Sequence, residues 1–262
     1  MTDDSSQDTP SLEIFDAVDQ GVDKVHTRSL DLSFNELLDM YQSEELIIEP
    51  EFQRLFRWND SKQSRFIESL ILEMPIPPIF VIQRSEGQYE LIDGLQRIST
   101  YICFRGALEE KEQLTLTNCD IVPELNGTTF EDLPNALRIR LKRSFIRVQV
   151  IRQESDPRLR YYMFKRLNEG GEPLLPQEVR NCSIRLLPDG QEVISYYQTL
   201  ASTNDFRETI ANISDNKKDQ QYDQELVVRF LAHKNFRENF SGNLTEHLTE
   251  FLEALAGAEQ AD

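Results

Sequence analysis

The stretch Leu91-Ile92-Asp93-Gly94-Leu95-Gln96-Arg97-Ile98-Ser99-Thr100 decides the fold, because it joins an apolar strand pattern to a helical one. Before it, apolar residues recur over 79–82 and 89–92 around a Ser85-Glu86-Gly87 turn, which predicts two strands. After it, the spacing of Ile98, Tyr101, Ile102 and Arg105 is helical. The sequence therefore predicts a strand ending at Asp93, a turn at Gly94 and a helix beginning near Gln96.

A turn of this kind presents the first free N–H groups of a helix, at the positive end of its dipole, to an anion. We therefore expect a phosphate site at Gly94, to which Arg97 adds a bidentate donor of fixed charge. Beside it, the Asp93 carboxylate suits a divalent cation or the polarisation of a water. The same residues also fit an ordinary hairpin and helix, with Asp93-Gly94 as turn chemistry and Arg97 on a solvated face.

Composition points to a soluble globular protein. The chain has 262 residues, of which 39% are hydrophobic, and no apolar run approaches the roughly 20 residues that span a bilayer. An acidic, polar start is unlike a secretory leader, so we expect a cytoplasmic protein without a membrane partner. Cys103, Cys119 and Cys182 are too widely spaced for a zinc knuckle or a disulfide framework, which predicts reduced, partly buried thiols.

Charge is unevenly distributed within a net charge of −18. Acidic residues crowd the first fifty positions, whereas the segment from Arg138 to Arg166, here called the basic stripe, opposes only Glu154 and Asp156. The cations of the basic stripe are Arg138, Arg140, Lys142, Arg143, Arg147, Arg152, Arg158, Arg160, Lys165 and Arg166. They either pair with the acidic N-terminal third or flank an anionic ligand, and double-stranded DNA is the candidate partner.

The pattern along the chain predicts an α+β protein, with a small mixed sheet and a helical C-terminal half packed on it. We expect a flexible acidic arm over 1–28, an α+β core over 29–155 and a helical subdomain over 156–262. In the core, Ser33 and Glu36 predict a capped helix start, and further helices are expected over 60–73 and 134–143. Strands are expected over 114–122 and 145–151. Later helices are predicted over 156–168, 176–187, 192–201, 221–234 and 243–256.

Two further segments carry polar residues suited to a ligand. The first runs from Arg166 through Asn168 and a Gly170-Gly171 loop to Arg180 and Asn181. Helix capping explains Asn168 and the glycines, but donors on both sides of a bare loop also suit a pocket. In the second, Gln53, Arg54 and Arg57 precede Trp58, the only tryptophan. Trp58 fits a core anchor, whereas Gln53 and Arg54 could reach a base or a phosphate.

Together these segments resemble the N-terminal domain of GmrSD-type modification-dependent restriction endonucleases, also known as domain of unknown function 262, in the ParB/sulfiredoxin-like superfamily. The matching pieces are Gln53-Arg54 with Arg57-Trp58, the 60–78 helix and prolines, Ile92-Asp93-Gly94-Leu95-Gln96-Arg97, and the 168–181 run. The resemblance covers roughly 30–254 and implies nucleotide binding, in some members hydrolysis, coupled to sensing of modified phage DNA. Asp93, Gly94, Gln96 and Arg97 would then form the triphosphate and metal site.

The chain departs from that family in two ways. The common motif has Gln where this chain has Leu95; a core-facing side chain tolerates the change, whereas one facing the nucleotide loses an amide contact. Many relatives also carry a C-terminal nuclease domain, and this chain stops where that domain would begin. The dispersed His26, His233 and His247 have no partners at metal spacing. We therefore do not expect this chain alone to cleave DNA.

Three hypotheses follow. In the first, the chain is an NTP-binding and possible Mg²⁺-dependent NTPase module, with Asp93 holding Mg²⁺ or orienting water, Gln96 positioning the nucleophile, and a separate nuclease subunit acting on DNA. Its nucleotide contacts are Gln53, Arg54, Arg57, Gly94, Arg97, Arg166, Asn168, Arg180 and Asn181. In the second, it is a non-catalytic DNA-sensing adaptor that uses the basic stripe. The third is a nicking nuclease using Asp93 and nearby acids.

Overall fold

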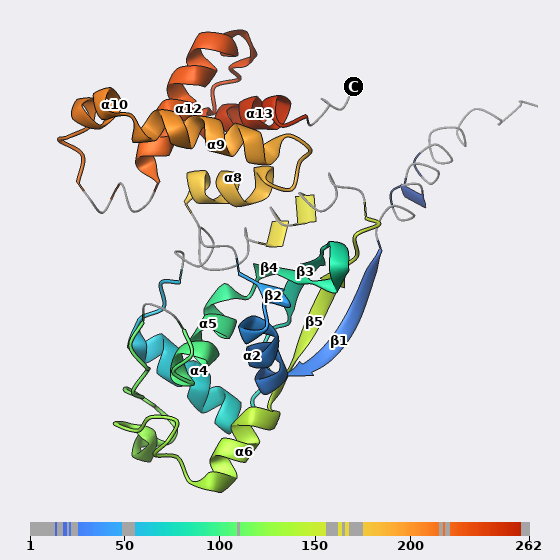
Figure 1. Ribbon diagram of the computed structural model, residues 1–262, viewed down its shortest axis with the longest axis vertical. Coiled ribbons are helices and arrows are strands. Elements are labelled where there is room, and N and C mark those ends of the chain that lie inside the picture. Colours follow the sequence, from blue (N-terminus) through green and yellow to red (C-terminus); the bar gives the residue numbers. More distant parts are fainter. Residues whose placement is uncertain are drawn as a thin grey trace, which may run out of the picture. The chain divides into compact units, whose positions relative to one another are not determined.

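The computed structural model describes residues 26–48, 56–108, 111–155, 175–214 and 221–257, together with 14, 18, 19, 21, 162, 163, 166, 167 and 217 (Figure 1). The chain divides into two compact units, Met1–Ser155 and Asp156–Asp262. The fold is α+β, since unit 1 contains a mixed sheet with helices and the regular elements described in unit 2 are helical.

The sheet of unit 1 has five strands in the order β1-β5-β3-β4-β2. Pairing is antiparallel between β1 and β5 and between β3 and β4, and parallel between β5 and β3 and between β4 and β2. The strands are β1 (Thr27–Ser33), β2 (Leu46–Ile47), β3 (Ile79–Gln83), β4 (Tyr89–Asp93) and β5 (Phe145–Ile151). Strand β4, which leads into the motif, therefore lies inside the sheet, between β3 and β2.

Helices α2, α4 and α5 pack together beside this sheet, with α2 also against β1 and β2 (Figure 1). The helices of unit 1 include α2 (Phe34–Gln42), α4 (Asp60–Ile71), α5 (Leu95–Phe104) and α6 (Asn135–Arg143), with 3-10 turns η1 (Ser85–Gly87) and η2 (Pro123–Leu125). Their core is apolar and fully buried at Phe34, Ile67, Ile79, Phe104 and Val150. Because both the strands and the helices contribute to this core, it fixes where β4 ends and α5 begins.

Caps set the starts of two of these helices. The Ser33 hydroxyl accepts a hydrogen bond from the Glu36 N–H at 3.1 Å, which confirms the predicted start of α2. The Asn59 side chain likewise accepts from the Lys62 N–H at the start of α4. Helix α4 ends at Ile71, ahead of the prolines at 75, 77 and 78, which have no N–H to donate to a helix or a strand ladder.

The sequence analysis missed one element of the core and assigned another wrongly. Strand β1 was not predicted, and its first two residues fall within the arm expected over 1–28. Residues 114–122 are not a strand, because side chains take the N–H groups that a ladder would need. The buried Glu68 carboxylate accepts from the N–H groups of Ile121 and Val122 at 2.9 and 2.7 Å. Such pairing with a carboxylate holds this loop without a neighbouring strand.

Unit 2 has a core of its own around Ile194, Tyr197, Val228 and Leu252, all of which are buried. Its helices include α8 (Pro176–Ile184), α9 (Gly190–Ser202), α10 (Asn204–Thr209), α12 (Tyr222–Asn235) and α13 (Leu244–Leu255), with the 3-10 turn η3 (Arg237–Asn239). The predicted helices over 176–187, 192–201, 221–234 and 243–256 are confirmed with small shifts of their ends, whereas α10 was not predicted. Most of the helix predicted over 156–168 lies outside the described residues.

Candidate functional site

The turn between β4 and α5 is the feature on which the sequence analysis concentrated. Strand β4 ends at Asp93, Gly94 adopts a left-handed conformation with φ of 100°, and α5 begins at Leu95, so the predicted strand–turn–helix arrangement is confirmed. A Cβ built on Gly94 would lie 2.2 Å from Cγ2 of Ile79. Both the backbone conformation and this close approach to β3 therefore require glycine.

The first turn of α5 has no side-chain cap. Gly94 cannot supply one, and the Ile98 N–H donates a helical hydrogen bond to the Gly94 carbonyl at 3.0 Å. The N–H groups of Leu95, Gln96 and Arg97 precede that bond and have no intrahelical acceptor. Helices α2 and α4 do have side-chain caps, so α5 differs from them in lacking one. This is the arrangement that suits an anion.

Arg97 and Asp93 form an ion pair across the turn. Nη2 of Arg97 donates to Oδ2 of Asp93 at 2.7 Å and to the Pro78 carbonyl at 3.0 Å. The two side chains are 17% and 27% exposed, so the pair is largely shielded but can be reached from solvent. Nε of Arg97 is buried and has no partner among the described residues. One donor of this fixed cation is therefore left over at the turn.

Gln96 fastens the segment before α4 to this turn. Its Oε1 accepts from the backbone N–H groups of Arg57 at 3.0 Å and Trp58 at 3.1 Å. Trp58 packs its ring edge-on to Phe66, with 5.7 Å between centroids, which anchors the segment in the core. The exposed Arg57 is thereby brought to the N-terminus of α5. Sequence reasoning placed Arg57 near a ligand, but it did not find the contact with Gln96, because that contact uses the backbone.

Leu95, where the resemblance described above implies a Gln, is 4% exposed and belongs to the core. Its side chain therefore faces the core, and a Leu at this position removes no polar group from the turn. The turn keeps its polar groups at Asp93, Gln96 and Arg97. Gln53, Arg54 and Asn168, also predicted as contacts, lie outside the described residues.

The remaining predicted contacts belong to unit 2. Arg166 is exposed, whereas Arg180 and Asn181 are 2% and 0% exposed within α8. Arg180 donates to Glu225 at 3.0 Å and to Gln177 at 2.9 Å. Burial lowers the pKa of Arg180, and the Glu225 carboxylate opposes that change. These contacts show Arg180 joining helices α8 and α12.

Asn181 belongs to the same buried network. Its Oδ1 accepts from the Tyr197 hydroxyl at 2.6 Å, and its Nδ2 donates to the side chains of Gln221 and Gln224, both at 2.7 Å. Gln177 Nε2 also donates to Oδ1. The amide thus makes hydrogen bonds at both ends within unit 2, a pattern that could not be read from the 168–181 run alone.

The basic stripe is partly neutralised by local ion pairs. Arg147 pairs with Asp31 at 3.0 Å, Arg140 with Glu73 at 3.5 Å and Arg152 with Glu154 at 3.5 Å. The hydrogen bond from Arg147 lowers the pKa of Asp31. Arg147 thus pairs with a residue of the acidic N-terminal third, which is one of the two interpretations of the basic stripe given above. On α6, Lys142 and Arg143 are exposed and form no ion pair with the described residues.

Other groups give no competing centre in the described part of the chain. No cluster of three or more His, Cys, Asp or Glu residues there could hold a metal ion by itself. Cys103, Cys119 and Cys182 are free thiols, two of them buried. In the same residues, no helix is long and apolar enough to cross a bilayer.

Comparison with known proteins gives one match. Residues 34–185, more than half of the chain, match the family described as the GmrSD restriction endonuclease, N-terminal domain. No curated protein and no solved structure matches. The matched range contains α2, the Asp93–Arg97 turn and α8.

Proposed function

Because this chain belongs to the GmrSD restriction endonuclease N-terminal domain family, and is thereby a component of a restriction system, we propose that it is the nucleotide-binding module of that system. The Asp93–Arg97 turn is the triphosphate site, and a separate effector nuclease acts on DNA. The observation that carries the proposal is the N-terminus of α5, which has no side-chain cap, beside a shielded arginine whose Nε has no partner in the part of the chain that the structure describes. Donors of both kinds suit phosphate oxygens.

The Asp93–Arg97 pair gives this site its dependence on charge. Without a ligand, the Asp93 carboxylate neutralises the guanidinium and partly shields it. A phosphate competes with Asp93 for Nη2 and is also within the reach of the α5 amides. The α5 dipole adds to the attraction of an anion at this end. On binding, the nucleotide's phosphate therefore replaces the Asp93 carboxylate as the partner of Arg97. Without a ligand, Asp93 spares the protein the free-energy cost of a shielded, unpaired guanidinium.

Mg²⁺ fits the residues at this turn as a cation shared with the nucleotide. Asp93 is the single carboxylate there, and Mg²⁺ is typically bound by one or two carboxylates with phosphates and waters. When bound, the ion would neutralise phosphate charge. Asp93, released from Arg97 by the phosphate, would hold the ion or orient a water for hydrolysis.

Gln96 and Arg57 complete the site in this proposal. Gln96 holds the 57–58 backbone against the first turn of α5, so that the exposed Arg57 side chain can reach a phosphate or a base. Where hydrolysis occurs, the Gln96 carboxamide positions the nucleophile. The contacts expected from Gln53, Arg54, Arg166, Asn168, Arg180 and Asn181 remain proposals.

Helix α6 supports a second candidate, a DNA-sensing adaptor. Arg140, Lys142 and Arg143 occupy the last turn of α6, and all three are exposed. Cations on a solvated helix end contact phosphates of a duplex, and such binding falls steeply with salt. The two candidates are compatible, because α6 and the α5 turn use different residues.

Equilibrium binding of each NTP with Mg²⁺ tests the first candidate. We expect the wild type to bind at least one NTP, Arg97→Ala to lose roughly tenfold or more in affinity, and the control Arg65→Ala to bind normally. Arg65 is a half-exposed arginine of unit 1 that pairs with Asp120. Absence of binding to every NTP, or equal binding by Arg97→Ala, would exclude this site. A salt-dependent duplex affinity lost in Arg140→Ala/Arg143→Ala would support the adaptor instead.

A further inference from the structure

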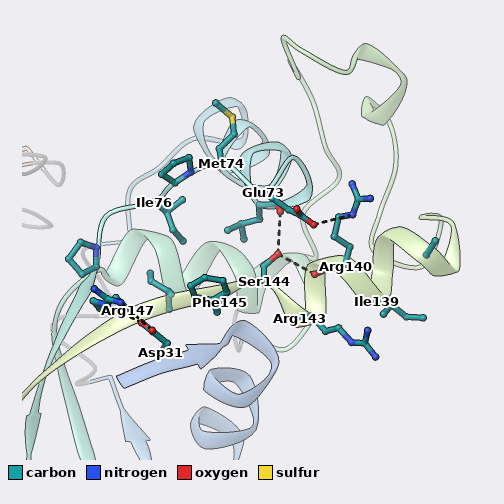
Figure 2. A pocket seen from close by; sticks show the side chains of 15 residues that line it. Asp31, Glu73, Met74, Ile76, Ile139, Arg140, Arg143, Ser144, Phe145 and Arg147 are labelled. Carbon is teal, nitrogen blue, oxygen red and sulfur yellow. Dashed lines mark hydrogen bonds and ion pairs between the residues drawn. The ribbon is translucent and has the colours of Figure 1, made fainter. Parts of the chain in front are cut away.

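A hollow of about 1120 Å³ lies in unit 1 between α4, α6 and β5 (Figure 2). Figure 2 shows Ile76, on the connection from α4 to β3, above the part of β5 that carries Phe145, and Met74 farther up on the same connection. Ile139 and Arg143 come from α6. None of the residues of the Asp93–Arg97 turn lines this hollow, here called the α6 groove.

The α6 groove exists because strand β3 begins late. The β3–β5 ladder starts at the Ile79–Val148 pair, whereas β1 pairs with β5 from Phe145 onward. The first three residues of β5 are therefore paired on the β1 side only. In place of a strand, the other side has the proline-rich connection over 74–78. Prolines donate no ladder hydrogen bonds, so the sheet cannot close over this space.

Large apolar side chains are exposed in the α6 groove. Phe145 is 66% exposed, Met74 45% and Ile139 40%, although most residues of these types are buried in a folded protein. Their clustering in one hollow is the arrangement of a binding surface for another apolar face. The volume exceeds that of most small-molecule sites, so a polypeptide segment fits it better than a metabolite.

The rim of the groove attracts negative charge. Of its five charged residues, Arg140 pairs with Glu73 and Arg147 pairs with Asp31, through side chains that are about half exposed. Arg143 is exposed and has no ion-pair partner in the described part of the chain. Within a protein of net charge −18, the rim thus offers one uncompensated cation and two arginines held by exchangeable surface bridges.

This chain contains a segment with the complementary pattern. Residues 11–23 read Ser-Leu-Glu-Ile-Phe-Asp-Ala-Val-Asp-Gln-Gly-Val-Asp, with four acidic residues and no basic one. Ile14, Val18 and Asp19 are helical in the structure, and Ile14 and Val18 are 64% and 55% exposed. Both side chains are large, apolar and exposed, so they offer an uncovered apolar contact in an acidic segment.

We propose that the α6 groove of one copy of this chain binds the 11–23 segment of a second copy. Apolar side chains around Ile14 and Val18 enter between Met74, Ile139 and Phe145. The acidic residues of the segment meet Arg143 and Arg140, which lie on the rim of the groove. Two such contacts related by a two-fold axis close a dimer. This interaction is independent of nucleotide binding, because it uses neither Asp93 nor Arg97.

Sedimentation velocity of the full chain across a concentration series tests the proposal. We expect a wild-type dimer whose dissociation constant rises roughly tenfold or more in Ile14→Asp/Val18→Asp, the arm variant, and in Arg143→Glu, the groove variant. Lys142→Glu is the matched control, because it neighbours Arg143 on α6 but does not line the groove. Gln20→Glu is the control within the segment. Both controls should dimerise normally.

Mixing the two variants identifies the occupant. A labelled groove variant retains its 11–23 segment, and an arm variant retains its groove, so the mixture should form one intact contact and sediment as a heterodimer. A wild type that stays monomeric throughout, or association that both variants retain, would overturn the proposal. If the variants instead change the sedimentation coefficient of the monomer and form no heterodimer, the 11–23 segment binds the groove of its own chain. That result would also overturn the proposal.

Discussion

Oδ2 of Asp93 lies 2.7 Å from Nη2 of Arg97, with the left-handed Gly94 between the two residues in sequence. The pair brings the last residue of β4 together with the first turn of α5. As a result, the Asp93 carboxylate and the Arg97 guanidinium are paired with each other when no ligand is bound. The ligand-binding properties predicted below depend on that ion pair.

Asp93→Asn removes the anion that competes with phosphate for Arg97. Without Mg²⁺, we expect this variant to bind the preferred NTP several-fold more tightly than the wild type, because a tenfold change corresponds to about 1.4 kcal/mol, within the range of one charged hydrogen bond. With Mg²⁺, the wild type should gain affinity and the variant should gain little. Titration calorimetry with and without the ion measures both effects.

The control for that titration is Asp31→Asn, which breaks the Arg147 pair between β1 and β5 and removes no residue of the turn. It should leave both affinities unchanged. Weaker binding by Asp93→Asn in the absence of Mg²⁺ would show that Asp93 does not compete for Arg97.

Gly94→Ala should destabilise unit 1 through two effects that can be separated. The left-handed backbone costs about 1–3 kcal/mol for a residue with a side chain, and the clash with Ile79 adds about as much. Gly127→Ala is the matched control: its φ is 80°, but a Cβ there meets nothing within 4 Å. Urea unfolding should therefore show a larger fall in the free energy of unfolding for Gly94→Ala than for Gly127→Ala. Equal falls would mean that Ile79 moves aside at no cost.

Arg180→Ala tests whether this residue holds unit 2 together. Removing one partner of a buried ion pair costs about 3–5 kcal/mol when the other charge is left unpaired. Glu225 retains its two hydrogen bonds from Arg229, which places the expected cost at the lower end of that range. We expect a large fall in the free energy of unfolding, whereas Arg237→Ala, an exposed control in the same unit, should change it little. A stable Arg180→Ala protein with impaired NTP binding would instead assign the residue to the ligand.

Cys119 should make stability fall at alkaline pH. Burial, reinforced by Glu68 and Asp120, raises the pKa of the Cys119 thiol to about 11 from an ordinary value of 9.0. Below pH 9 the thiol is neutral in both states, so its contribution is complete; between 9 and about 11 only the unfolded thiol ionises, and stability is lost. The free energy of unfolding in urea should thus fall between pH 9 and about 11 for the wild type relative to Cys119→Ala. A difference that stays constant over this interval would contradict the prediction.

The sequence predicted those parts of the fold that depend on local pattern. Glycine in a strand-to-helix turn, Ser33 as a cap and the alternation over 145–151 gave the β4–α5 junction, the start of α2 and strand β5. Strand β1 was missed because five of its seven residues sit at exposed or polar positions, which leaves little apolar alternation. Residues 114–122 have an apolar pattern, but Glu68, distant in sequence, binds their backbone.

The same distinction applies to the site. Asp93, Gly94 and Arg97 are adjacent in sequence, so their convergence could be predicted from the turn alone. The ion pair between Asp93 and Arg97 depends on the helical phase of α5, and the bond from Gln96 to the 57–58 backbone depends on packing over a separation of 39 residues. Arg180 and Asn181 look like ligand donors in sequence because their partners, including Glu225 and Gln221, follow roughly forty residues later.

Hydrogen–deuterium exchange with and without the preferred NTP and Mg²⁺ tests the central claim most directly. The account predicts that added nucleotide slows exchange at the amides of Leu95, Gln96 and Arg97, and that Arg97→Ala abolishes this protection. Protection confined to other segments, such as α6 or unit 2, with unchanged exchange over 93–97, would contradict a triphosphate site at this turn.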